Sequence, residues 1–504
     1  AILQEKVKGT PDVEIGKAFG VTFKYIERLI TRSRGLNVSS LKSSKRIKTL
    51  YPKNFKEEQT TVWSFKQRGT WATHSGEYRG NWSPYIPRNV ILKYSKPGEL
   101  ILDYFCGAGT TAVECKLLGR RCIALDINEK AIELAKKNVS FDINHQLPIF
   151  SDEELYTQVF EPMLLVGDAR DLSFLQNNSI DLICAHPPYA NIVHYTDYKT
   201  GDLSFFDVDD FLREMSKVAK ESFRVLKPGR QCAILIGDTR RKKHVVPLGF
   251  KLINVYSNVG FKLRELIIKQ QHNCKTTGFW YANSIKYNFL LLAHEYLLIF
   301  EKPTASAHST IKRNETDYRT IIAQFEKPFF GEKLNVLETT TVWILPQKNF
   351  EEQLNRNVID RYSNGKEHLI ISFELRDKNE NEVEKIKTTE KPRSKKLIFI
   401  KSPLLNNTTL TNLAIECYLE EMKKFVEESL HTIDKYGFLV IQTRDVRING
   451  YIEPIAKMIV DIFEHHNNLW LKEIVVVTQE GSNMLTQEVG EYLNIVHQYL
   501  LVFE

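Results

Sequence analysis

Short apolar runs alternate with helix-compatible segments between residues 100 and 126. The run at 100–102 leads into a turn that contains Gly107 and Gly109, and a helix-compatible segment and a second apolar run ending in Asp126 follow. Glycines let the backbone come close to a ligand, and a carboxylate at the end of the second strand can accept both hydroxyls of a ribose. The pattern therefore predicts a strand, turn, helix and strand of a nucleotide-binding crossover.

A second strand-like run ends in two prolines. Residues 182–185 are apolar, and His186, Pro187, Pro188 and Tyr189 follow them directly. Because prolines cannot continue a hydrogen-bonded ladder, they predict a stiff elbow that holds the flanking side chains at the carboxyl edge of the sheet.

Taken together, the two stretches resemble the signatures of the S-adenosylmethionine-dependent DNA amino-methyltransferases. That family carries Phe-x-Gly-x-Gly, here Phe105, Gly107 and Gly109, and Asp/Asn/Ser-Pro-Pro-Tyr, here residues 186–189. The chain departs from the second signature at its first position, which is His186. The resemblance implies a Rossmann-like α/β fold, S-adenosyl-L-methionine as cofactor and double-stranded DNA as substrate.

The resemblance also implies where the cofactor binds. The acid at the end of the third strand, Asp168, would receive the adenine amino group, and Asn81 and Ser83, with Trp82 between them, would cover the methionine end. The expected cofactor-binding residues are Asn81, Ser83, Asp103, Phe105, Gly107, Gly109, Thr110, Thr111, Asp126 and Asp168.

The elbow is expected to carry the catalytic groups, His186, Pro187, Pro188 and Tyr189. By resemblance, the Pro187 carbonyl and the His186 ring would accept hydrogens of the target amine, and Tyr189 would stack on a base flipped out of the duplex. In an alternative mechanism His186 is a general base that takes the amine proton after transfer. Either role needs an unprotonated ring nitrogen, so activity is expected to fall at acid pH.

The target base is only partly constrained. Methylation of cytosine C5 needs a Pro-Cys nucleophile, and none of the 17 prolines is followed by cysteine, so that class is excluded. Relatives with Ser at the position of His186 mostly modify cytosine, and those with Asp or Asn mostly modify adenine. We favour N4-cytosine, with N6-adenine as the alternative. An RNA guanine-N2 methyltransferase and a DNA-binding regulator with an inactive methylase fold are further alternatives.

Three further segments are candidates for DNA contact. Residues 12–34 resemble a helix-turn-helix whose second helix could enter a major groove. The basic cluster at 240–243 lies after a predicted strand, and residues 270–288 mix donors with aromatic rings. The expected DNA-binding residues are Lys24, Arg28, Arg240, Arg241, Lys242, Lys243 and Trp280.

The second part of the chain repeats the first. RNVILKYS at 88–95 recurs as RNVIDRYS at 356–363, and HEYLLIFE at 294–301 recurs as HQYLLVFE at 497–504. The repeat has no Gly-x-Gly after residue 373, and LIFIKSPLL replaces LICAHPPYA. We expect a degenerate methyltransferase-like copy without chemistry, which packs on the first copy as an internal pseudo-dimer partner or reads DNA sequence.

Composition sets the remaining limits. The chain of 504 residues is 42% hydrophobic and 26% charged with a formal net charge of +7, which permits nucleic-acid binding without demonstrating it. The seven cysteines are scattered without a Cys-x-x-Cys pair, so we expect reduced thiols, no metal site and a cytoplasmic location. No apolar run reaches the roughly 20 residues that span a bilayer, so no membrane association is expected.

These observations predict the following organisation. We expect a monomer with a helical N-terminal domain, a Rossmann-like class I methyltransferase domain and the degenerate repeat of that fold. Restriction-modification with a cognate restriction endonuclease, phage defence and regulation are the alternative biological roles. The expected domains are a helix-turn-helix-like domain at 1–38, a basic linker at 39–60, the catalytic domain at 61–303, a linker at 304–336 and the repeat at 337–504.

Overall fold

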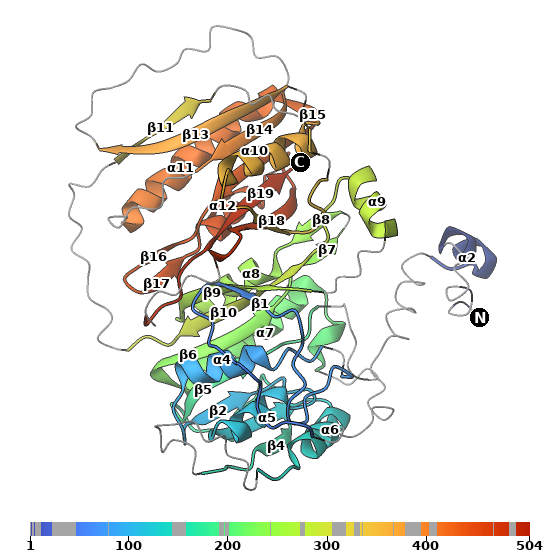
Figure 1. Cartoon of the computed structure of the whole chain (residues 1–504), viewed down its shortest axis with the longest axis vertical. Helices are drawn as coiled ribbons and strands as arrows, with labels where there is room; N and C mark the ends of the chain where they lie inside the picture. Colours follow the sequence, from blue (N-terminus) through green and yellow to red (C-terminus); the bar gives the residue numbers. More distant parts are fainter. Residues whose placement is uncertain are drawn as a thin grey trace.

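The computed structural model of the chain contains one eight-stranded and one seven-stranded sheet. Figure 1 shows the two sheets with their helices stacked along the long axis of the molecule. We call residues 47–304 the first half and residues 319–504 the second half. The structure describes residues 2, 5, 12–22, 47–78, 80–143, 158–190, 196, 201–241, 243–272, 278–304, 319–326, 333–334, 336–365, 367–377, 395–402, 411–466, 468–482 and 490–504.

The first sheet has the order β1-β9-β10-β6-β5-β2-β3-β4. Its central strands are parallel, whereas β10 is antiparallel to both β6 and β9. The chain leaves β2 toward β3 on one side and later returns to β5 on the other, and ligands of open α/β sheets bind where the strand order reverses in this way. The strands are β1 (Val62–Ser64), β2 (Leu100–Asp103), β3 (Arg121–Asp126), β4 (Met163–Val166), β5 (Ile180–Ala185), β6 (Leu226–Ile236), β9 (Lys262–Gln270) and β10 (His294–Glu301), with the hairpin β7 (Thr239–Arg241) and β8 (His244–Val246).

Helices cover both faces of this sheet because successive strand residues point to opposite sides. Ile101 packs in one cluster with residues of α4, α5 and α6, and its neighbour Leu102 packs in another with residues of α7 and α8. The layers place the glycine turn and the proline elbow at the same edge of the sheet. The helices are α4 (Tyr85–Tyr94), α5 (Thr110–Leu117), α6 (Glu129–Val139), α7 (Val208–Val225), α8 (Leu248–Ser257) and α9 (Gly278–Lys286), with a short 3-10 helix, η2 (Leu203–Phe205).

The second sheet repeats the order of the first. Read from β12, it is β12-β18-β19-β15-β14-β13-β11, so each strand up to β13 corresponds to β1, β9, β10, β6, β5 and β2 in turn. Strand directions agree as well, because β12 and β18 are parallel and β19 is antiparallel to both neighbours. The elements are β11 (Arg319–Phe325), β12 (Val342–Leu345), α10 (Phe350–Tyr362), β13 (His368–Asp377), β14 (Lys395–Lys401), α11 (Asn412–Ser429), η5 (Leu430–Thr432), β15 (Ile433–Thr443), β16 (Val446–Ile448), β17 (Tyr451–Glu453), α12 (Ile455–Phe463), β18 (Leu471–Gln479) and β19 (His497–Phe503).

The two sheets differ at the edge where the first half has β3 and β4. In the second half this place is taken by β11, which precedes β12 in the chain and pairs antiparallel with β13. In the described part of the second half, β13 is not followed by counterparts of α5, β3, α6 and β4. The repeat thus keeps the architecture of the first half without its nucleotide-binding crossover.

The halves meet through contacts that occur twice. Arg240 of the first half forms an ion pair with Glu473, whose other carboxylate oxygen accepts from a backbone N–H of the first half. Arg447 of the second half forms the matching pair with Glu265. Both glutamate side chains are essentially inaccessible to water. Arg240 and Arg447 occupy equivalent positions in the two halves, and so do Glu265 and Glu473. The two ion pairs are therefore related by an approximate twofold, and the interface has the form of an isologous dimer contact within one chain.

A second duplicated contact lies beside the first. The ring Nδ1 of His294 lies 2.9 Å from the hydroxyl of Thr341, and Nδ1 of His497 lies 2.8 Å from the hydroxyl of Thr61. Burial lowers the pKa of His294 to about 4 and that of His497 to about 3. Both rings are therefore neutral at neutral pH, as buried hydrogen-bonded interface residues should be.

Part of the segment expected to be a basic linker, residues 47–60, contacts the helices of the first half. Tyr51 donates a hydrogen bond to the Leu117 carbonyl, and Arg88 of α4 lies over the rings of Tyr51 and Phe55. Ile47 and Leu50 pack against the apolar cluster that contains Ile101 and residues of α4, α5 and α6. These apolar side chains, spaced among the lysines, attach residues 47–60 to the first half. Upstream, α2 (Asp12–Phe19) lies in the segment that resembles a helix-turn-helix, whereas Lys24 and Arg28 lie outside the described residues.

Candidate functional site

A hydrogen bond to the Asp126 carboxylate connects the turn after β2 to the carboxyl end of β3. Asp126, the last residue of β3, accepts a hydrogen bond from the backbone N–H of Gly107 at 3.0 Å and another from Asn128 at 2.8 Å. Gly107 has a φ of 49°, and a Cβ at this position would lie 2.9 Å from the ring of Tyr78. The turn therefore requires glycine both for its backbone conformation and for the aromatic ring above it.

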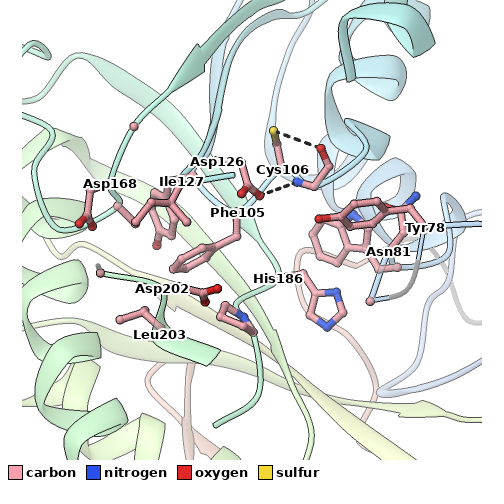
Figure 2. A pocket seen from close by; sticks show the side chains of 18 residues that line it. Tyr78, Asn81, Phe105, Cys106, Asp126, Ile127, Asp168, His186, Asp202 and Leu203 are labelled. Atoms are coloured by element: carbon pink, nitrogen blue, oxygen red, sulfur yellow. Dashed lines mark hydrogen bonds between the residues drawn. The ribbon is translucent and has the colours of Figure 1, made fainter. Parts of the chain in front are cut away.

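A cavity lies at this edge of the sheet, where the carboxyl ends of the parallel strands meet. Figure 2 shows Asp168 at one end and His186, Tyr78 and Asn81 at the other, with Phe105 and Asp126 between them. Asp168 is also bound by the guanidinium of Arg170 through contacts of 2.6 to 3.1 Å. The cavity thus presents carboxylates on one side and aromatic rings on the other, a suitable lining for a nucleoside with a cationic tail.

Several residues expected to bind a cofactor support the cavity from behind. Asp103 is buried and accepts hydrogen bonds from the Thr111 hydroxyl and the Phe105 backbone, and burial raises its pKa to about 7. Gly109 has a φ of 81°, and a Cβ there would meet Ala135 of α6 at 3.0 Å. These groups set the turn geometry and do not line the cavity.

Two more of the expected residues belong to the segment that covers the cavity. The hydroxyl of Thr110 donates to the side-chain oxygen of Asn81, which lines the cavity. Ser83 donates to the backbone oxygen of Arg68 at 2.8 Å and lines a neighbouring cavity instead. The helix α5 is thereby joined to the segment at 80–83.

The neighbouring cavity shares residues 80–82 and His186 with the first. Its lining carries more cationic and amide groups, among them Lys66, Arg68 and Lys269. Arg68 donates to the backbone oxygens of Asn81 and Trp82, and burial lowers its pKa to about 10. His186 therefore stands at the junction of an acidic and a basic cavity.

The His186 ring contacts the rings of Trp82 and Tyr189 at this junction. Trp82 stacks on it, with ring centroids 5.8 Å apart and an interplanar angle of 23°. Burial lowers the pKa of His186 to about 4, the Lys269 and Arg68 charges act in the same direction, and the Glu295 carboxylate and the Gly80 backbone oppose them. The ring is neutral near pH 7 and can accept a hydrogen bond.

The other residues of the elbow differ in their surroundings. Pro188 lines the first cavity, whereas Pro187 is buried. Tyr189 donates a hydrogen bond of 2.5 Å to Glu295 and lies 3.0 Å from Nε2 of His186. Its ring contacts Gly237, where an added Cβ would meet it at 3.1 Å. In the chain without DNA, the Tyr189 hydroxyl thus binds charged and polar groups of the sheet.

The residues of the basic cluster at 240–243 differ in their surroundings. The guanidinium of Arg240 lies in the interface between the halves, where it binds Glu473 and the backbone oxygens of Leu290 and Lys472. The reason is the buried glutamate across the interface, which needs a cationic partner. Arg241 and Lys243 are exposed on the hairpin, Lys242 lies outside the described residues, and Trp280 belongs to α9.

The sequence analysis did not identify two charged residues of the site. Glu295 and Lys269 lie opposite each other on β10 and β9, with Nζ and Oε2 2.8 Å apart, and both line the second cavity. A signal was available for Glu295, a charged residue beside the apolar run at 297–300, but not for Lys269, because β9 carries several other charged residues. Asp202 and Leu203, which line the first cavity, follow a segment outside the described residues and had no such signal.

Some classes of site have no support in the structure. Among the residues that the structure describes, no group of three or more His, Cys, Asp or Glu side chains is arranged to hold a metal ion. Within those same residues, no helix is long and apolar enough to cross a membrane.

Comparison with known proteins gives a family match over much of the chain. The family model described as DNA methylase matches residues 27–137 and 180–396. A second model, described as RMKL-like, methyltransferase domain, matches residues 90–240. Both matched regions contain the glycine turn and the proline elbow.

Individual relatives match over shorter segments. The type II methyltransferase M.SmaI of Serratia marcescens is 33% identical over 88 residues, which cover 18% of this chain and 29% of that protein. A tRNA (guanine(10)-N2)-dimethyltransferase of Methanothermobacter thermautotrophicus is 29% identical over 114 residues, covering 22% of this chain and 29% of that protein. The match therefore spans less than a third of either relative.

Among solved structures, a putative DNA modification methylase of Thermus thermophilus, complexed with S-adenosyl-L-methionine, is 27% identical with a TM-score of 0.21. The similarity covers 30% of this chain and 57% of that one.

Proposed function

Because this chain belongs to the DNA methylase family, we propose that it transfers a methyl group from S-adenosyl-L-methionine to an exocyclic amine of a DNA base. The preferred target is N4 of cytosine, and N6 of adenine is the alternative. The observation that carries the proposal is the junction of two cavities at His186, one lined by carboxylates and the other by cationic groups.

The residues around the first cavity fit the cofactor. We assign the ribose hydroxyls to Asp126 and the adenine amino group to Asp168, with Phe105 between them, because carboxylates accept from hydroxyl and amino groups. Gly107 leaves room for the backbone to approach a ligand beneath Tyr78. When bound, the sulfonium supplies an already activated methyl group, and the protein contributes alignment and exclusion of water.

The second cavity fits a base taken out of a duplex. Its cationic rim of Lys66, Arg68 and Lys269 suits the phosphates that flank an extruded nucleotide, and amide side chains suit its polar edge. Trp82 offers a ring for stacking at the shared wall. The base enters here and the cofactor binds in the first cavity, so that the two reactants meet at His186.

The chemistry required of the protein is modest. The target amine is a weak nucleophile because its lone pair is conjugated with the base ring. Acceptors that bind its hydrogens favour tetrahedral geometry and free that lone pair for attack. We assign this task to the neutral ring of His186 and to the Pro187 carbonyl, and the pKa of about 4 keeps the ring unprotonated at neutral pH.

Product analysis tests the proposal directly. The full chain is incubated with mixed-sequence duplex DNA and methyl-labelled S-adenosylmethionine, and the DNA is digested to nucleosides for mass spectrometry. We expect labelled N4-methylcytosine, while N6-methyladenine would establish the alternative base. The Asp126→Ala variant serves as the control for label that arrives without the cofactor site.

RNA is the second candidate substrate, favoured by the match to a tRNA guanine-N2 dimethyltransferase. Label in N2-methylguanosine of RNA, with none in DNA, would move the chain to that class. Cofactor binding without label in either nucleic acid would contradict both activities and leave a DNA-binding protein with an inactive methylase fold.

A further inference from the structure

A chain of hydrogen bonds runs from the proline elbow to a charged pair inside the first sheet. The ammonium of Lys269 lies 2.8 Å from Oε2 of Glu295, and Oε1 of the same carboxylate accepts a 2.5 Å hydrogen bond from the Tyr189 hydroxyl. That hydroxyl lies 3.0 Å from Nε2 of His186. Four side chains from β9, β10 and the elbow are thus connected in series.

The direction of each hydrogen bond follows from the charged end of the series. Burial opposes the ionisation of Glu295, but the Lys269 ammonium and the hydrogen bond from Tyr189 hold its pKa below the ordinary value. The carboxylate therefore has no proton to donate, and the single hydroxyl proton of Tyr189 is directed to it. The oxygen of Tyr189 must then accept from the ring, so the proton of neutral His186 is on Nε2.

The other nitrogen of the ring is consequently an acceptor. Nδ1 of His186 is buried and makes no hydrogen bond of 3.5 Å or less to a described residue, and the Gly80 backbone oxygen lies near the ring without closing such a bond to Nδ1. Such unsatisfied buried groups are rare and call for an explanation. Nδ1 is bonded to Cγ, as is Oδ1 of an aspartate or asparagine, so it offers its lone pair at the same distance from the backbone.

From these contacts we propose that Glu295, acting through Tyr189, fixes the proton of His186 on Nε2 and leaves Nδ1 free to accept a hydrogen of the target amine. The inference rests on the proposed function and makes Glu295 a positioning residue for it. Trp82 and the Gly80 backbone cover the ring in the chain without DNA, so the segment at 80–82 has to shift when a base enters.

The second half provides an internal comparison. Strand register aligns Ala185 with Ile400, because both pair with equivalent residues of β6 and β15. The position after each is His186 in the first half and Lys401 in the second. The same register aligns Lys269 and Glu295 with Val477 and Gln498. In the sequence Tyr189 aligns with Leu404, which lies outside the described residues.

Neighbouring interface residues are kept in both halves. His294 and Tyr296, on either side of Glu295, recur as His497 and Tyr499. Only the residue between them changes, from glutamate to Gln498. The half without the glycine turn has therefore lost the series as a unit while the interface beside it is maintained.

The glycine that leaves room for the Tyr189 ring is also absent from the second half. Gly237, whose lack of a side chain admits the Tyr189 ring and the Glu295 methylene, corresponds to Arg444 in the second half. The Arg444 side chain donates to a backbone oxygen of its own half. The Tyr189 ring thus needs a glycine directly after β6, and the second half has arginine at that position.

Nitrogen NMR tests the proton position without any assay of activity. The full chain is labelled with 15N-histidine, and long-range proton–nitrogen correlations are assigned to His186 by their loss in His186→Gln. We expect a neutral ring with the proton on Nε2 in the wild type near pH 7. A proton on Nδ1 in the wild type would overturn the inference whatever the activity of the protein.

Kinetics of Glu295→Gln test the effect on transfer. The amide can donate to Tyr189, which allows Tyr189 to donate to His186 and moves the proton to Nδ1. We expect kcat to fall about tenfold or more, the cost of one well-placed hydrogen bond, with little change in the KM for cofactor. The same substitution at Glu301, at the other end of β10 and also ion-paired, should leave kcat unchanged.

Tyr189→Phe provides a second route should Glu295→Gln fold poorly. Its matched control is Tyr499→Phe, which removes a hydroxyl from a His–Tyr contact of 2.9 Å in the second half. We expect the ring proton and kcat to change in the first variant only. One outcome would overturn the positioning role and leave the proposed function intact. In it, the wild type methylates DNA, and both Glu295→Gln and Tyr189→Phe keep the wild-type kcat and the wild-type position of the ring proton.

Discussion

Asp126 accepts a hydrogen bond from the backbone N–H of Gly107, 19 positions earlier in the chain, at 3.0 Å. One carboxylate thus holds the glycine turn against β3 while it lines the first cavity. The residue assigned to the ribose is also the residue that shapes the turn beneath it.

We predict that Asp126→Ala weakens the binding of S-adenosylmethionine roughly 10- to 100-fold, because hydrogen bonds to a charged group contribute about 1.5 to 3 kcal/mol each. Isothermal titration calorimetry with the full chain measures the dissociation constant. Asp171→Ala, an exposed carboxylate outside the cavity, is the control and should bind normally. Equal affinity in Asp126→Ala and the wild type would show that the first cavity is not the cofactor site.

We predict that His186→Ala abolishes methyl transfer and leaves cofactor affinity largely intact, since the ring contributes an acceptor for the target amine. His186→Asn should recover part of kcat, because its Oδ1 offers an acceptor from the same Cγ. Single-turnover assays with duplex DNA measure the transfer rate. Full activity of His186→Ala would rule out the acceptor role and the general-base role together.

We predict a pH profile that is flat well below neutrality. The active form of His186 is the neutral ring, and a pKa of about 4 keeps it neutral until the pH approaches that value. Activity should change less than about twofold between pH 7 and pH 5.5, whereas a ring with the ordinary pKa near 6.5 would lose about tenfold. Measurements of kcat at saturating DNA distinguish these profiles, and a midpoint near 6.5 would contradict the burial of the ring.

We predict that Arg240→Ala lowers the free energy of unfolding by roughly 3 kcal/mol, because it leaves the buried carboxylate of Glu473 without its cation. Arg447→Ala should have a similar effect through Glu265, which is equally buried. Urea denaturation measures both. The exposed neighbour Arg241→Ala is the control and should change the unfolding free energy only slightly.

The fold was largely predictable because its strands and helices have strong local patterns. The strands β2 and β5 form where the apolar runs at 100–102 and 182–185 indicated, and α5 forms in the helix-compatible segment after the glycine turn. The repeat was visible because related segments keep the same order in both halves.

Contacts between distant segments were less predictable. The run of basic residues at 240–243 gives no information about the buried Glu473, more than two hundred positions away, that Arg240 binds. Gly109, Thr110 and Thr111 belong to the glycine signature, but only the three-dimensional structure shows that they support the turn without lining the cavity. For Glu295 the pattern showed a charge in a strand and not its partner on the elbow.

The duplicated contacts between the halves have a consequence for stoichiometry. A symmetric dimer that formed through the surface between the halves would bring two reaction centres to a palindromic site. In this chain the second half occupies that surface, and its described residues lack the nucleotide-binding crossover. One chain therefore offers one centre. On duplex DNA we expect each encounter to modify a single strand and to release a hemimethylated product.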